Sequence, residues 1–225
     1  MIKVVAVYTG QGLSEPLKKV FDDQLPDAKL INIIDDSIIS EVVNAGEVTS
    51  SVKRRLFQYF QNAVEMGADV ILNTCSSVGE VADLARQFID IPIVKIDEAM
   101  AIEAVENYKT IGVVATLPST LQPTMRLIER QAELRGKNVR IIDGLAKGAY
   151  DALVSGSPEK HDQIILETAS ALAEQVDAIV LAQGSMARME TTLREQTAIP
   201  VLSSPARGVM DIKRMLGESL YADNK

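Results

Sequence analysis

Short apolar runs recur along the chain and alternate with longer segments that have helical spacing. The first run is Lys3–Val7, and further runs follow at Ile33–Ile34, Val70–Leu72 and Ile91–Val94. Each run is bounded by polar or turn-forming residues, a pattern typical of buried parallel strands. The first half of the chain therefore predicts four short strands.

The second half repeats this order at a separation of 108 residues, as from Asp69 to Asp177. A repeat at one fixed period indicates a duplicated structural unit. The aligned pairs are Lys3–Val7 with Ile111–Ala115, Ile33–Asp35 with Ile141–Asp143, Asp69–Leu72 with Asp177–Val180, and Ile91–Val94 with Ile199–Leu202.

Segments of helical length lie between the runs. Val48–Gly67 shows the pattern well, because Val52, Leu56, Phe60, Ala63 and Val64 share one helical face. The other predicted helices are Glu15–Gln24, Val78–Phe88, Glu98–Lys109, Thr124–Arg135, His161–Gln175 and Met189–Gln196.

Strand–helix alternation predicts an α/β fold with a parallel sheet covered on both faces. We expect two tandem, pseudo-symmetric, doubly wound units, residues 1–97 and 98–204, with a cleft between them. The C-terminal helix, residues 205–225, is expected to pack back on the first unit.

Composition narrows the possible partners. The net charge of −8 argues against a nucleic-acid partner, which requires a basic face. The sequence has no apolar run of transmembrane length, so no membrane partner is expected. One cysteine forms no internal disulfide, and the N-terminus leads directly into a strand, so we expect a cytoplasmic protein. A homodimer or a higher homo-oligomer is expected from the commonness of such assemblies.

Candidate binding residues follow the predicted strands, because ligands bind beyond the carboxyl ends of parallel strands. These turns open helices, whose N-termini favour a carboxylate or a phosphate. Hydroxyl and amide residues at helix starts are also ordinary N-caps, so an ordinary structural role stays open for each of them. The candidates are Thr9 and Gln11 in the first turn, Asn73, Thr74, Ser76 and Ser77 around Cys75, Thr116, Ser119 and Thr120 in the second half, and Gln183, Gly184 and Ser185 after its third strand.

Cys75 is the sharpest candidate for chemistry. It lies between a predicted strand and a predicted helix, where the helix N-terminus is expected to lower the thiol pKa and favour the reactive thiolate. A small buried apolar role is the alternative. His161 is expected to be an exposed surface residue, and its distance from Cys75 in the sequence gives no metal-ligand spacing. Asp97, Glu98 and Arg207 follow the fourth strands, where a site role and a solvated surface role are equally open.

Gly10-Gln11-Gly12 keeps a nucleotide-binding function open as an alternative. The third glycine of a dinucleotide motif is missing, although Asp35 and Asp36 stand at the end of the second strand.

The chain resembles the aspartate/glutamate/hydantoin racemase superfamily over nearly its whole length. The resemblance rests on the strand and turn that end in Cys75-Ser76-Ser77, on Ala115–Thr120 and on Leu181–Ala187. The distances from Cys75 to Pro92 and from Gln183 to Pro200 are both 17 residues. It implies two facing domains, a small carboxylate substrate, no cofactor, a homodimer, and one catalytic cysteine from each half. Relatives without both cysteines include decarboxylases of aryl-substituted malonates.

The chain departs from this pattern at Gln183, which occupies the position of the second cysteine. An amide is neither a base nor an acid at neutral pH. We therefore expect an isomerase that uses Cys75 as its single thiol, at a carbon next to the carboxylate of an amino acid, a hydantoin or a dicarboxylate. A malonate decarboxylase and a non-catalytic carboxylate-binding protein are the alternatives. Specificity is expected to come from the loops Asp36–Val48 and Leu145–Pro158.

Overall fold

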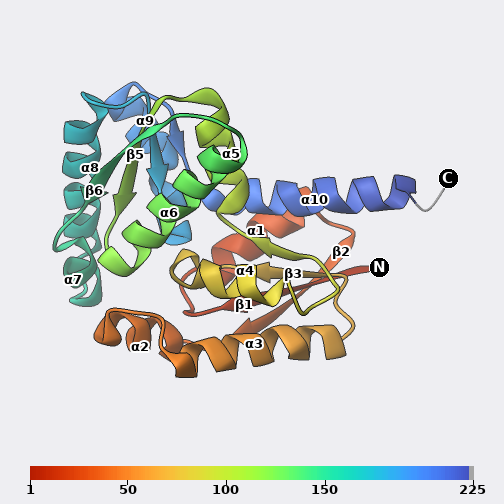
Figure 1. Cartoon of the computed structure of the whole chain (residues 1–225). Coiled ribbons are helices and arrows are strands. Elements are labelled where there is room, and N and C mark those ends of the chain that lie inside the picture. Colours follow the sequence, from red (N-terminus) through yellow and green to blue (C-terminus); the bar gives the residue numbers. More distant parts are fainter. Residues whose placement is uncertain (223–225) are drawn as a thin grey trace. The chain divides into compact units, whose positions relative to one another are not determined.

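The computed structural model describes residues 1–222 of the chain, which divides into two compact units. The first unit comprises Met1–Ile96 together with the segment from Pro205 onward, and the second comprises Asp97–Ser204. Each unit contains one four-stranded parallel sheet (Figure 1), so the predicted α/β fold with two doubly wound sheets is confirmed.

The sheet of the first unit has the order β2-β1-β3-β4. Alternate residues of its strands enter two separate apolar clusters, because successive side chains point to opposite faces. One face is covered by α1 (Ser14–Gln24) and α10 (Ser204–Ala222), and the other by α2 (Ser37–Ala45), α3 (Ser50–Glu65) and α4 (Gly79–Ala85). The strands are β1 (Ile2–Tyr8), β2 (Ala28–Ile34), β3 (Val70–Asn73) and β4 (Ile93–Lys95).

The second unit repeats this plan with the order β6-β5-β7-β8. One face is covered by α5 (Glu98–Asn107) and α6 (Pro118–Leu134), and the other by α7 (Ala149–Val154), α8 (Pro158–Ala173) and α9 (Glu190–Thr197). The strands are β5 (Thr110–Ala115), β6 (Arg140–Leu145), β7 (Ala178–Leu181) and β8 (Val201–Leu202). Within residues 1–222, no helix combines the length and the apolar character needed to cross a bilayer.

The strand register corrects the alignment of the two halves. The offset of 108 residues holds for the third and fourth strands, where Ile71 pairs with Ile93 and Ile179 pairs with Val201. Val4 pairs with Val70, whereas Ile111 pairs with Ala178, so the first strands correspond at an offset of 107. The offset for the second strands is 111, because Val4 also pairs with Leu30 and Ile111 with Ile141. Thr9 is therefore the equivalent of Thr116.

Two segments predicted as loops contain helices. Asp36–Val48 includes α2, whose Ile38 and Val42 are fully buried or nearly so, and Leu145–Pro158 includes α7. Two predicted helices also begin differently. α6 begins at Pro118, six residues before the predicted start at Thr124, because proline at the first helical position is compatible with a helix. The segment after Cys75 first forms the 3₁₀ turn η1 (Ser76–Val78), and only then the short helix α4.

Helix α10 gives a stability prediction, since Gly208 lies against the backbone of Ile96. A Cβ at Gly208 would lie 2.7 Å from the Ile96 carbonyl oxygen and 3.0 Å from its Cα. We expect Gly208→Ala to lower the free energy of unfolding by about 1–3 kcal/mol, because a backbone neighbour has little room to move. Urea unfolding measures the change.

Gly217 provides the matched control on the same helix, because a Cβ there meets no atom within 4 Å. Gly217→Ala is expected to stabilise by about 0.5–1 kcal/mol. Equal stability of Gly208→Ala and the wild type would show that α10 does not pack closely at Ile96.

Candidate functional site

The turn that carries Cys75 is held rigidly at the carboxyl end of β3. The Asn73 side-chain amide donates to the Cys75 carbonyl at 3.0 Å, and the Thr74 hydroxyl donates to the Val7 carbonyl at 2.9 Å. Asn73 is fully buried and Thr74 nearly so. These predicted binding residues therefore shape the turn, and no described group donates to the Asn73 Oδ1 atom.

The Cys75 sulfur is surrounded by hydrogen-bond donors. Cys75 is partly exposed as a residue, but it packs against the apolar cluster that contains Val78. Burial raises the pKa of the Cys75 thiol, while hydrogen bonds from the Thr9 hydroxyl, the Ser77 N–H and hydroxyl, and the Val78 N–H oppose that rise. The net pKa is raised, so the lowered pKa predicted from the sequence is wrong. The helix expected to lower it begins as a 3₁₀ turn, and no cation offsets the cost of burial.

The equivalent turn of the second unit is built around Gln183. The Thr116 backbone N–H donates to Gln183 Oε1 at 2.8 Å, and Gln183 Nε2 donates to the Thr116 hydroxyl at 2.6 Å. Both ends of the amide are therefore occupied by one residue. The pairs Thr9–Cys75 and Thr116–Gln183 occupy equivalent places in the two units, so glutamine replaces a thiol within a conserved contact between two turns of the duplicated fold.

The remaining predicted binding residues lie near these two turns. Gly184 and Ser185 lie in the 3₁₀ turn η2 (Gly184–Met189), where Ser185 is exposed. The Ser119 hydroxyl, in the first turn of α6, is buried without a hydrogen-bond partner among the described residues. Ser76, Ser77, Thr116 and Thr120 are buried.

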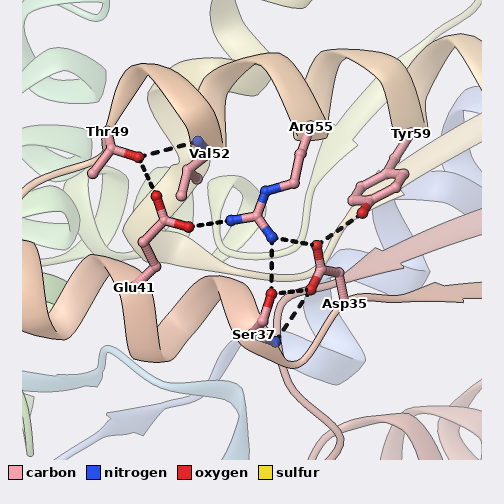
Figure 2. Close-up of polar contacts among 7 residues, drawn as sticks. All are labelled: Asp35, Ser37, Glu41, Thr49, Val52, Arg55 and Tyr59. Carbon is pink, nitrogen blue, oxygen red and sulfur yellow. Dashed lines mark hydrogen bonds and ion pairs between the residues drawn. The ribbon is translucent and has the colours of Figure 1, made fainter.

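The two acidic residues after β2 are engaged within the protein (Figure 2). The Asp35 carboxylate accepts hydrogen bonds from Ser37, Arg55 and Tyr59, and the Asp36 carboxylate accepts one from Gln11 at 2.5 Å. Burial would raise the pKa of Asp35, but these hydrogen bonds and the Arg55 charge outweigh it and lower the pKa. A ribose hydroxyl would have to compete with these contacts, so this arrangement does not favour nucleotide binding.

His161 is buried, which corrects its predicted exposure. It is only 5% exposed, and its Nδ1 lies 2.7 Å from Asp162 Oδ1. Asp162 also binds both guanidinium nitrogens of Arg188, in η2, at 2.6 and 2.5 Å. The Arg188 hydrogen bond lowers the pKa of Asp162. Sequence spacing alone does not reveal this link between α8 and η2, because Asp162 and Arg188 are 26 residues apart.

The three charged residues after the fourth strands have different environments. Asp97 is buried before α5, Glu98 accepts a hydrogen bond from Gln131 at 3.2 Å, and Arg207 lies partly buried in α10. Among the described residues, no group of three or more His, Cys, Asp and Glu side chains is placed to hold a metal ion.

Comparison with known proteins finds a family model and similar structures. The model described as Asp/Glu/Hydantoin racemase matches residues 2–211. An allantoin racemase from Klebsiella pneumoniae has a TM-score of 0.73 at 16% identity, covering 97% of this chain and 89% of that one. A glutamate racemase isoform from Bacillus anthracis has a TM-score of 0.78 at 15% identity, with coverages of 97% and 82%.

An aspartate racemase from Picrophilus torridus has a TM-score of 0.74 at 13% identity, with coverages of 96% and 95%. At these identities the structures show a shared fold. No curated protein matches the chain significantly.

Proposed function

This chain belongs to the Asp/Glu/hydantoin racemase family, and from that premise we propose that it uses a single thiol, Cys75, to move a proton at a carbon next to a carboxylate. The observation that carries the proposal is the set of donors around the Cys75 sulfur, contributed by Thr9, Ser77 and Val78. Such donors stabilise a thiolate once it forms. The equivalent place in the second unit holds an amide, which has no exchangeable role as acid or base.

The proposed substrate is a small acid. Similar structures include racemases of glutamate, aspartate and allantoin, so we infer an amino acid, a hydantoin or a dicarboxylate as the substrate class. Its carboxylate would be held by N–H and hydroxyl groups of the turns after the strands, which favour anions. The proposed binding residues are Thr9, Gln11, Asn73, Thr74, Ser76, Ser77, Thr116, Ser119, Thr120, Gly184 and Ser185, with Gln183 as a hydrogen-bonding group.

A single thiol predicts proton exchange at one face of the carbon. The thiolate would remove the α-proton, and the same sulfur would return a proton from solvent to the same face. Configuration would therefore be retained. Independence of a cofactor, a homo-oligomeric state and a cytoplasmic location stay predictions of the sequence.

The raised pKa of Cys75 favours a second candidate, the decarboxylation of a malonate-type acid. Burial keeps the thiol protonated at neutral pH, which suits a proton donor. Loss of carbon dioxide would leave an electron pair on the α-carbon, the thiol would protonate that carbon, and water would restore the thiol proton.

Alkylation of Cys75 tests whether this thiol lies at a binding site. Iodoacetamide reacts with the thiolate, so we expect the rate to rise with pH to a midpoint above about 8.5, the ordinary pKa of a free cysteine. We also expect at least one acid in a panel of amino acids, hydantoins and malonates to slow the reaction severalfold. Mass spectrometry follows the modified fraction, and the urea-unfolded chain, in which the midpoint should be ordinary, is the control. A normal midpoint without protection by any acid would contradict the proposed site.

A further inference from the structure

Arg55 links helix α3 to helix α2 through a network of charged and hydroxyl groups (Figure 2). Its Nη1 atom lies 2.9 Å from Asp35 Oδ2 and 2.8 Å from the Ser37 hydroxyl, and its Nη2 atom binds Glu41. Tyr59 donates to Asp35 at 2.8 Å. One guanidinium therefore joins the end of β2 to two positions on α2, a task that suits the planar fork of arginine.

The N-cap of α3 strengthens the same link. The Thr49 hydroxyl donates to Glu41 at 2.5 Å and accepts from the Val52 N–H at 3.1 Å. The Arg55 side chain is 30% exposed and the Asp35 side chain 14%. The network is thus partly shielded from water, where ion pairs are screened less than at an open surface.

Helix α2 in turn contacts the turn after β1. The Ile39 N–H donates to the Thr9 carbonyl at 3.3 Å, and Gln11 donates to Asp36 at 2.5 Å. Gly10 lies against Ile39, since a Cβ at Gly10 would be 3.8 Å from Ile39 Cγ2. These contacts fix the backbone from which the Thr9 hydroxyl reaches the Cys75 sulfur.

The second unit offers an internal comparison, because it lacks both the thiol and the network. Gln163 stands at the position of Arg55 and Ala146 at that of Asp35, in each case within the aligned elements. The Gln163 amide binds Glu167 on its own helix. Thr116, the equivalent of Thr9, is held by Gln183. The network thus occurs in the unit whose threonine must be oriented toward a thiol.

We propose that Arg55 is a positioning residue for Cys75, which acts through α2 and Thr9 to keep the Thr9 hydroxyl directed at the sulfur. This inference rests on the proposed function in taking Cys75 as the working group. Its physical content is a coupling between Arg55 and Thr9, two residues with no direct contact among the described hydrogen bonds.

A double-mutant cycle on the alkylation of Cys75 tests this coupling. The variants are Arg55→Met, Thr9→Val and the combination, assayed with iodoacetamide at pH 8 after thermal unfolding has shown that each is folded. We expect each single variant to slow alkylation about three- to tenfold, the value of one hydrogen bond to the sulfur. The double variant should be no slower than Thr9→Val alone, because Arg55 has no further route to the thiol.

Three further variants separate positioning from general loss of structure. Arg54→Met changes an exposed arginine on the same helix and is expected to leave the rate unchanged. Arg55→Lys should fall between the wild type and Arg55→Met, because an ammonium group replaces only part of the fork. Ser37→Ala removes one contact on α2 while the charges remain paired, and it serves if Arg55→Met does not fold. It should slow alkylation in the same direction by a smaller factor.

Additive losses in the double variant, an unchanged rate in Arg55→Met, or faster alkylation would each overturn the inference. The assay follows the thiol and requires no turnover. Coupling in a protein that exchanges no substrate proton would therefore remove the proposed function alone, whereas additive losses in an active enzyme would remove this inference alone.

Discussion

Cys75→Ser is expected to lower the rate of α-proton exchange by about 10²- to 10⁴-fold, the usual contribution of a positioned acid or base. Serine has nearly the shape of cysteine and keeps the surrounding donors, but its hydroxyl has no nearby group to remove its proton. Proton NMR in heavy water measures the exchange of a substrate identified by protection of the thiol. Thermal unfolding should change little, because the turn is held by Asn73 and Thr74.

A displaced thiol provides the matched control. Ser76→Cys in the Cys75→Ser background restores a cysteine one residue along the chain, away from the Thr9 hydroxyl. We expect no recovery of exchange. A Cys75→Ser variant that keeps more than about a tenth of the wild-type rate would exclude Cys75 as the proton-transferring group.

Gln183→Cys is expected to add inversion of configuration to the exchange reaction. The substitution puts a thiol at the position equivalent to Cys75, next to Thr116, the equivalent of Thr9. Racemases that this family resembles use one cysteine from each half. We expect inversion to rise about 10²-fold or more above the wild type, as measured by chiral chromatography of the recovered acid.

Two variants check the assignment of faces. Gln183→Ser, which also removes the amide but adds no thiol, should show no inversion. Cys75→Ser combined with Gln183→Cys should exchange the opposite enantiomer from the one that the wild type exchanges. A folded Gln183→Cys protein that exchanges normally and never inverts would show that residue 183 takes no part in binding the reacting carbon.

The duplicated fold is readable from the sequence because buried parallel strands are short apolar runs that stand out from helical spacing. The third strand illustrates this, since β3 and β7 lie where the repeat predicts them, and Cys75 and Gln183 follow at equivalent positions. Small shifts in the first and second strands stay hidden, because apolar residues at neighbouring positions align almost equally well.

The surroundings of Cys75 are less readable. A thiol between a strand and a helix suggests a lowered pKa, but its actual pKa depends on burial and on contacts from Thr9, which is 66 positions away in the chain. The segment after β2 reads as a loop because its polar residues hide two buried apolar ones, Ile38 and Val42. Arg55 looks like any surface arginine of an amphipathic helix until α2 is placed beside it.

The most direct test is proton NMR of the wild-type protein in heavy water with each single enantiomer of the protecting acids, followed by chiral chromatography. The account predicts that the α-proton of one enantiomer is replaced by deuterium while its configuration is retained. Inversion as fast as exchange would contradict the single-thiol account, because it requires a second acid or base at the opposite face.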